Sequence, residues 1–377
     1  MKLLAEMQKP SLLIEQGVCY ALFAYDVSLA IDLDDAERRM HAITERETLR
    51  HRRPTPRYFQ YRPAPVRVSQ AAEPLTVGSW VTTSTVDVVL YDFGALLVLY
   101  RIPLKGAFAE LLALSDTLYD NAALLTDSRQ RVEQLCSVIR PATTRLEIAD
   151  VVEDYVIFHI QAFSEPDSLK TLRNMYGEDI ARILRAEPQP LSDLEIEDAL
   201  LCQVSYGRDD LTVIDWNAAL VYDREGEDVR AVLEFANVEL LEMRYLDQLL
   251  DDALNQSYRT LPSRPWWAFA GMRRYRGELR RIAQLQVDSA VLFEGVNNAL
   301  KLLGDQYLAR VYRLASQRFH LSEWDASILR KLQTLESIYE KVSDQATAYR
   351  AEILEWIIII LIAFEIVWPF MVKWGGH

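Results

Sequence analysis

The amino-acid sequence predicts an α+β protein, in which an N-terminal mixed hairpin/helix domain is followed by a long α-helical hairpin and one C-terminal transmembrane helix. Before residue 228, runs rich in β-branched and aromatic residues alternate with turn residues and single helical stretches. After it the apolar spacing is helical throughout, and the chain closes in an almost wholly apolar run. Hairpins with single helices favour α+β over a regular βαβ series with a parallel sheet.

Length and composition limit the classes of protein to consider. The 377 residues are enough for two domains, or for one domain with an elongated appendage. Half of them are hydrophobic, which excludes bulk disorder, and the net charge of −14 argues against a surface that coats nucleic acid. Cys19, Cys136 and Cys202 lie far apart without a CxxC pair, and the histidines show no metal-ligand spacing. We therefore expect a reducing compartment, no metal and no cofactor.

A strand followed by a helix is predicted for the N-terminal segment, 1–45. Residues 18–31 are rich in β-formers, and the stretch after them has helical composition. The acidic residues Asp32, Asp34 and Asp35 stand where the helix begins, and the helix dipole favours negative charge there. We interpret them as cap and first-turn residues in preference to a metal cluster.

A basic, proline-rich linker is predicted over 46–75. Residues 46–67 contain seven Arg and four Pro, and proline disfavours regular structure. Arginines interleaved with aromatic residues also match a contact with RNA or anionic lipid, although a solvated linker is the simpler interpretation and the one we favour. The candidate contact residues are Arg50, Arg52, Arg53, Arg57 and Tyr58.

The α+β domain proper is predicted over 76–228. Its expected elements are a hairpin over 84–103 that turns at Asp92–Gly94, a helix around 106–138, and strands at 147–163, 200–207 and 211–223. The segment contains no phosphate-binding loop, dinucleotide fingerprint, nucleophile elbow or zinc-protease motif, and neither does the rest of the chain. Nothing in the sequence indicates catalysis, so we expect that the protein is not an enzyme.

A stalk of antiparallel helices is predicted over 229–352. From Ile282 to Leu314, apolar residues recur in steps of three, four and seven, which is one stripe of an amphipathic helix. The stretch FHLSEWD at 319–325 breaks this pattern, and a second stripe then runs from Ile328 into the apolar end. That second arm, about 46 residues, would be roughly 70 Å long. Facing stripes favour an antiparallel hairpin, and the remaining apolar surface favours self-association.

A C-terminal transmembrane helix is predicted over 353–374. From Trp356 to Val372 the side chains are apolar apart from Glu365. Seventeen residues extend roughly 25 Å, slightly less than the ~30 Å hydrocarbon core. Insertion of the apolar residues contributes roughly −3 to −7 kcal/mol, against about +3 kcal/mol for the carboxylate. We therefore favour a span over a buried core helix of a soluble domain.

The carboxylate inside the predicted span needs an explanation of its own. In mid-bilayer a carboxylate is stable only when it is protonated, paired or facing protein. Glu365 and Trp368 are therefore predicted to lie at a helix–helix contact within an oligomer, with snorkelling of Glu365 to the interface as the alternative.

Two stretches resemble the required-for-meiotic-nuclear-division family: FANVELLEMRYLD at 235–247 and ILEWIIIILIAFEIV at 353–367. The resemblance is close over about 229–367, weaker over 80–228 and absent over 1–75. That family joins mitochondrial inner-membrane proteins of fungi and animals to uncharacterised bacterial relatives. The residues that match its pattern are Asn237, Glu239, Glu242, Arg244, Asp247, Glu355 and Trp356.

The resemblance implies a membrane-anchored, self-associating protein; mitochondrial members support translation of membrane proteins made inside the organelle. The N-terminal residues do not have the Arg-rich, acid-poor composition of a transit peptide, so we expect none. We therefore expect a non-catalytic scaffold in the cell inner (plasma) membrane, with the bulk of the chain cytoplasmic and with the bilayer, a homo-oligomer and a ribosome or other large assembly as partners. The alternative is an oligomeric ion-conducting protein, whose layout is similar to the CorA-type magnesium channels and whose pore Glu365 would line.

Overall fold

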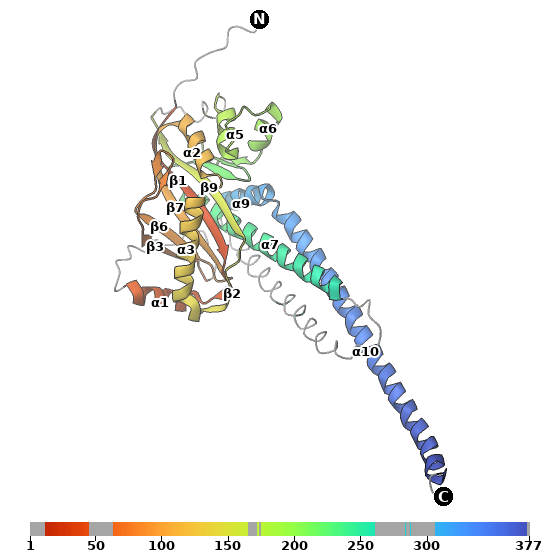
Figure 1. Cartoon of the computed structure of the whole chain (residues 1–377). Coiled ribbons are helices and arrows are strands. Elements are labelled where there is room, and N and C mark those ends of the chain that lie inside the picture. The colour runs from red at the N-terminus through yellow and green to blue at the C-terminus, as the bar shows by residue number, and fades with distance from the viewer. Residues whose placement is uncertain are drawn as a thin grey trace. The chain divides into compact units, whose positions relative to one another are not determined.

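The computed structural model describes residues 12–44, 63–164, 172, 175–260, 283, 287 and 306–374, which fall into two compact units (Figure 1). The described residues up to Leu246, together with 306–325, form unit 1. Those from Asp247 to 287, together with 326–374, form unit 2. Two helices, α7 (Glu227–Thr260) and α10 (Leu321–Trp374), have residues in both units.

Unit 1 is built on an eight-stranded sheet with the order β10-β11-β12-β9-β1-β7-β6-β3. Neighbouring strands are antiparallel, except that β12 runs parallel to β9. Two short pairs, β2 with β8 and β4 with β5, stand apart from it. The strands are β1 (Leu13–Asp26), β2 (Ser28–Ile31), β3 (Val66–Ala71), β4 (Thr76–Val77), β5 (Trp80–Val81), β6 (Thr85–Leu90), β7 (Ala95–Ala107), β8 (Thr143–Leu146), β9 (Val152–Phe163), β10 (Gln203–Val204), β11 (Leu211–Ile214) and β12 (Ala218–Tyr222).

Strand β1 lies near the centre of the sheet, although the sequence pattern placed it in a separate N-terminal segment. It pairs with β7 on one side and β9 on the other, so that Leu22 is opposite both Leu99 and Tyr155. Its side chains are apolar on both faces, which suits a strand covered on both sides. Segment 1–45 and segment 76–228 therefore contribute to one sheet.

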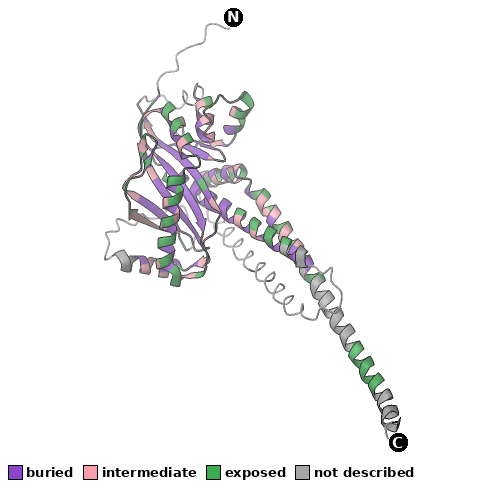
Figure 2. Cartoon of the chain, viewed as in Figure 1, coloured by how far each residue is buried: buried purple, intermediate pink, exposed green. Residues whose placement is uncertain are grey.

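Helices cover both faces of the sheet (Figures 1 and 2). One face packs against α1, α2, α3 and α5, and the opposite face packs against the first half of α7 and against α9. Asn121 caps α3 by accepting a hydrogen bond from the backbone N–H of Leu124. The remaining helices are α1 (Leu33–Thr44), the 3₁₀ turn η1 (Phe108–Glu110), α2 (Leu111–Leu118), α3 (Ala122–Ile139), the 3₁₀ turn η2 (Arg140–Ala142), α5 (Gly177–Arg185), α6 (Asp193–Ala199) and α9 (Gln306–Arg318).

In unit 2 the second half of α7 packs against the first part of α10. The Lys331 ammonium lies 2.7 Å from an Asp247 oxygen and 2.6 Å from an Asp251 oxygen, while Ser327 donates to Asp247. Residues that come later in α10 thus meet residues that come later in α7, so the two segments run in the same direction. The first arm of the predicted antiparallel hairpin lies mostly outside the described residues, so that hairpin stays a prediction.

The local pattern predicted most elements, and three differences have physical reasons. The hairpin turning at 92–94 is confirmed as β6 and β7. The helix expected over 106–138 is interrupted, because Tyr119 adopts an extended conformation and Asn121 starts a new helix. The run at 211–223 is two strands, since Asp215 and its neighbours form a turn. Inside the predicted linker, β3 forms the sheet edge by pairing with β6.

The predicted C-terminal membrane span is not supported. The helix itself is confirmed, because α10 runs without interruption from Leu321 to Trp374. In the part of the chain that the structure describes, however, no helix is both long and apolar enough to cross a bilayer. The side chains described at this end are those of 355–364.

Candidate functional site

The first half of α7 buries polar side chains against the sheet. Asn237, Glu239 and Glu242, three of the residues that carry the sequence resemblance, are at most 3% exposed. Both polar atoms of the Asn237 amide lack a hydrogen-bond partner among the described residues. Polar groups in such positions cost free energy unless they are hydrogen-bonded, and the cost is greater for an ionised group than for a neutral one. These residues are therefore part of the core rather than an exposed recognition surface.

Glu234 is the centre of a buried ionic network on this face. Arg230, one helical turn before it on α7, donates to one of its oxygens at 2.5 Å, and Arg67 of β3 pairs with the other. Arg67 also lies 3.5 Å from Asp87 of β6, which accepts from Arg101 of β7. Carboxylates and guanidinium groups thus alternate across three strands and the helix, and each buried charge has an opposite charge beside it.

Glu239 faces the other way, toward α9. The Tyr312 hydroxyl donates to a Glu239 oxygen at 2.7 Å. Burial raises the pKa of Glu239 to about 8, while the Tyr312 hydrogen bond lowers it and the nearby Asp325 raises it further. This carboxyl therefore keeps a proton near neutral pH, and its hydrogen bond joins α7 to α9.

Glu242 lies beside Asp26, the last residue of β1, and both carboxyls are buried. Burial raises the pKa of Asp26 to about 8 and raises that of Glu242 well above its usual range, where the negative charge of Asp26 raises it further. Nearby, Arg244 donates to Glu153 of β9 at 2.6 Å. This end of α7 thus holds one ion pair and one pair of acids.

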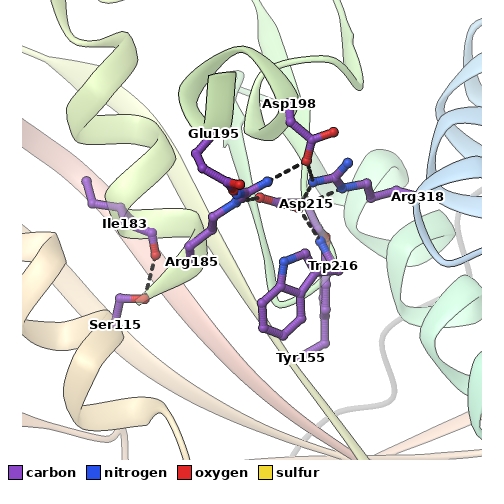
Figure 3. Close-up of polar contacts among 9 residues, drawn as sticks. All are labelled: Ser115, Tyr155, Ile183, Arg185, Glu195, Asp198, Asp215, Trp216 and Arg318. Atoms are coloured by element: carbon purple, nitrogen blue, oxygen red, sulfur yellow. Dashed lines mark hydrogen bonds and ion pairs between the residues drawn. The ribbon is translucent and has the colours of Figure 1, made fainter. Parts of the chain in front are cut away.

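A second polar cluster joins α5, α6, the β11–β12 turn and α9 (Figure 3). Asp215, which is fully buried, accepts from Arg185 Nε at 3.0 Å and from Arg318 Nε at 2.6 Å. The two guanidinium groups also share Asp198, at 2.5 and 2.8 Å, and Arg185 pairs with Glu195. Each arginine is the last residue of its helix. We call these five residues the Asp215 clamp.

Backbone contacts fix the Asp215 clamp in place. The Trp216 N–H donates to the Asp215 carboxylate at 2.7 Å, and the Tyr155 hydroxyl donates to the Asp215 carbonyl oxygen at 2.9 Å. Beside the clamp, Ser115 donates to the Ile183 carbonyl oxygen and so ties α2 to α5 (Figure 3). No local sequence pattern marks this cluster, because its members lie far apart along the chain; Asp198 and Arg318, for example, are 120 residues apart.

The described apolar run near the C-terminal end of α10 is exposed (green in Figure 2). Trp356 is 59% exposed, and the side chains of 357–362 and 364 are between 47% and 62% exposed. Consecutive residues in a helix point in directions about 100° apart, so seven in a row present apolar surface on every side. We call residues 356–364 the apolar end of α10.

The other predicted site residues fall elsewhere. Asp247 contacts Ser327 and Lys331 in unit 2, and Glu355 is exposed on α10. The side chains of Glu365 and Trp368 lie outside the described residues, so their contact stays a prediction. The same holds for Arg50, Arg52, Arg53, Arg57 and Tyr58. Within the described ranges, no three His, Cys, Asp or Glu side chains come together as metal ligands.

Comparison with known proteins relates the chain to an uncharacterised protein of an archaeon. It is 24% identical over 219 residues to "Uncharacterized protein MJ0711" of Methanocaldococcus jannaschii. The match covers 57% of this chain and 65% of that protein, which is just under two thirds of the relative's length. No solved structure matches the chain.

A family model matches residues 16–228, which is more than half of the chain and takes in the sheet from β1 to β12. This corrects the resemblance drawn from the sequence, since the comparisons support an uncharacterised domain family and not the meiotic-nuclear-division family. That resemblance rested on 235–247 and 353–367, both beyond the matched region, and it did not extend to residues 16–75. The chain belongs to the family described as "Uncharacterized protein MJ0711, N-terminal domain".

Proposed function

We propose that the protein is a non-catalytic scaffold that attaches to a lipid bilayer through the apolar end of α10. The observation behind this proposal is the exposure of that segment: seven consecutive large apolar side chains stand at least 47% exposed on a helix. An exposed apolar surface of this kind is a site of interaction with a membrane or another protein. The charged clusters around Glu234 and Asp215 in unit 1 are paired internally and have a structural role in this proposal.

Lipid is favoured over a second copy of the chain because of how the apolar residues are distributed. A partner helix covers a stripe of about 100° on a neighbour, as the heptad seam of a coiled coil does. Residues 356–362 place apolar side chains around the whole circumference of the helix, and lipid can surround that circumference completely. Trp356 stands at the start of the run, where an aromatic ring suits the interface between headgroups and acyl chains.

The apolar end of α10 supplies a driving force for this attachment. On an insertion scale, each Ile or Leu contributes about −0.3 to −0.6 kcal/mol at full depth, so the six at 357–362 contribute roughly −2 to −4 kcal/mol. Attachment of this strength is reversible, and association of several copies would strengthen it.

The first prediction tests this attachment. The full-length protein is expected to float with phosphatidylcholine vesicles in a density gradient, and the double variant Ile358→Asp/Ile362→Asp is expected to stay in the bottom fractions. Each substitution costs about 3 kcal/mol on the insertion scale, so the partition coefficient should fall more than 100-fold. Leu329→Asp is the matched control, because Leu329 is also an exposed apolar residue of α10 but lies outside the run.

Three results would separate the alternatives. If the unsubstituted protein fails to float, or if Leu329→Asp weakens flotation as much as the double variant does, the proposed attachment is wrong. If a second copy of the chain covers the apolar end of α10 instead, chemical cross-linking in the absence of vesicles would join two copies there. Release of trapped ions from the same vesicles would instead favour the ion-conducting alternative.

A further inference from the structure

Asp26 and Glu242 form a pair of buried acids, and no cation among the described residues is paired with them. Asp26 ends β1 in the centre of the sheet, and Glu242 reaches it from α7; they are 4% and 3% exposed. Neither Glu242 oxygen has a hydrogen bond of normal geometry to a described residue, although Asp26 is near enough for the two carboxyls to interact. An ionised carboxylate without a donor in such a position costs far more free energy than the neutral acid does.

The groups that face the pair increase this cost. Glu147, which follows β8, adds a third negative charge near Asp26, and Tyr245 lies one turn along α7. The positive charge closest along α7, Arg244, is held by Glu153 of β9 at 2.6 Å. Among the described residues, the groups interacting with the pair are thus acidic or phenolic. Two like charges this close cannot both be ionised without strong repulsion.

We propose that Asp26 and Glu242 together bind a proton that locks α7 onto the sheet, and that loss of this proton above neutral pH loosens α7. The two acids act as one site, because a proton on either oxygen set relieves the repulsion for both. When the proton leaves, a negative charge appears between β1 and α7, and no described residue donates a hydrogen bond to the Glu242 carboxylate. The direct consequence is a weaker contact along the helix around Glu242.

The sign of the pH effect follows from linkage. In the unfolded chain, Asp and Glu lose their protons near pH 4, whereas in the folded protein the raised pKa values keep a proton bound at higher pH. Between these limits the folded state holds more protons than the unfolded state, so stability falls as pH rises. For one such proton the folding equilibrium constant falls about tenfold per pH unit between roughly pH 5 and 8.

The test is the pH dependence of unfolding of the full-length chain. Denaturant titrations between pH 5 and 8.5 should show the unsubstituted protein losing stability with pH. The variant Glu242→Gln keeps the shape of the side chain but does not ionise. Its folding equilibrium constant should therefore fall less steeply with pH, by up to about a factor of ten per pH unit. Glu336→Gln is the matched control, since Glu336 is an exposed mid-helix residue of α10, and its pH slope should equal that of the unsubstituted protein.

Two further measurements keep the proposal open to refutation. Asp26→Asn removes the charge from the other member of the pair and should flatten the pH slope in the same way, whether or not Glu242→Gln folds well. Amide hydrogen exchange around residues 238–246, corrected for its intrinsic pH dependence, should speed up above pH 7.5 in the unsubstituted protein and not in either variant. Equal pH slopes in the unsubstituted protein and in both variants would overturn the proposal.

Discussion

Replacing Asp215 by Ala is expected to lower the free energy of unfolding by about 3–5 kcal/mol, one of the two largest effects that the structure predicts. The fully buried carboxylate receives hydrogen bonds from Arg185 and Arg318, which are each 11% exposed. Its removal leaves two guanidinium groups with only Asp198 and Glu195 at the surface. The loss should appear as a lower denaturant midpoint with an unchanged m-value.

The outer carboxylates of the same clamp provide the control. Asp198 and Glu195 also contact the arginines, but their side chains are 50% and 56% exposed. Because water screens such pairs, Asp198→Asn and Glu195→Gln are expected to cost about 0–1 kcal/mol each. If Asp215→Ala proved as mild as these two, the clamp would not be what joins α9 to the β11–β12 turn.

The fold was predictable where neighbouring residues decide it. The hairpin of β6 and β7 follows from β-formers on either side of the Asp92–Gly94 turn, and α10 up to Trp368 follows from an apolar stripe without Gly or Pro. Its continuation through Pro369 to Trp374 does not follow from that pattern. The order of the strands was not predictable in this way. Apolar residues on both faces of β1 were visible in the sequence, but pairing it with β7 and β9 depends on contacts about 80 and 140 residues away.

The same distinction between local and long-range contacts decides which candidate sites could be predicted from the sequence. The apolar end of α10 could be found from composition alone, because seven consecutive large apolar residues need a cover in any fold. The acids of α7 were noticed as a motif, yet Glu is rarely buried, so the sequence predicted neither their burial nor their protonation. Their environment is created by β1 and α9, whose positions are set by the tertiary structure.

Gly94→Ala is expected to destabilise the protein by about 2–6 kcal/mol, enough to reduce the yield of folded protein. Gly94 has φ +104°, a conformation that side-chain-bearing residues rarely adopt, and strain of this kind costs about 1–3 kcal/mol. A Cβ atom there would lie 1.6 Å from the carbonyl oxygen of Ser28. The backbone must shift to relieve such an overlap, which adds a packing cost of about 1–3 kcal/mol.

The backbone has little room for that shift. The Gly94 carbonyl oxygen accepts from the Val27 N–H at 3.0 Å, and its own N–H donates to the Tyr91 carbonyl oxygen at 3.2 Å. Moving Gly94 away from Ser28 therefore strains the hydrogen bonds that hold the hairpin turn against the end of β1.

A comparison of two glycines isolates this effect from the general cost of adding a methyl group. At Gly207 a Cβ would lie 3.1 Å from Oδ1 of Asp210 and 4.0 Å from the Asp209 nitrogen, so a shift of the Asp210 carboxylate by a few tenths of an ångström makes room for it. Gly207→Ala should therefore change stability by less than about 1 kcal/mol, and it can even stabilise through the unfolded state. The measurement is the thermal unfolding midpoint of Gly94→Ala compared with that of Gly207→Ala. Equal midpoints would mean that the 92–94 turn is not packed against Ser28. Close packing would then no longer explain why position 94 is a glycine.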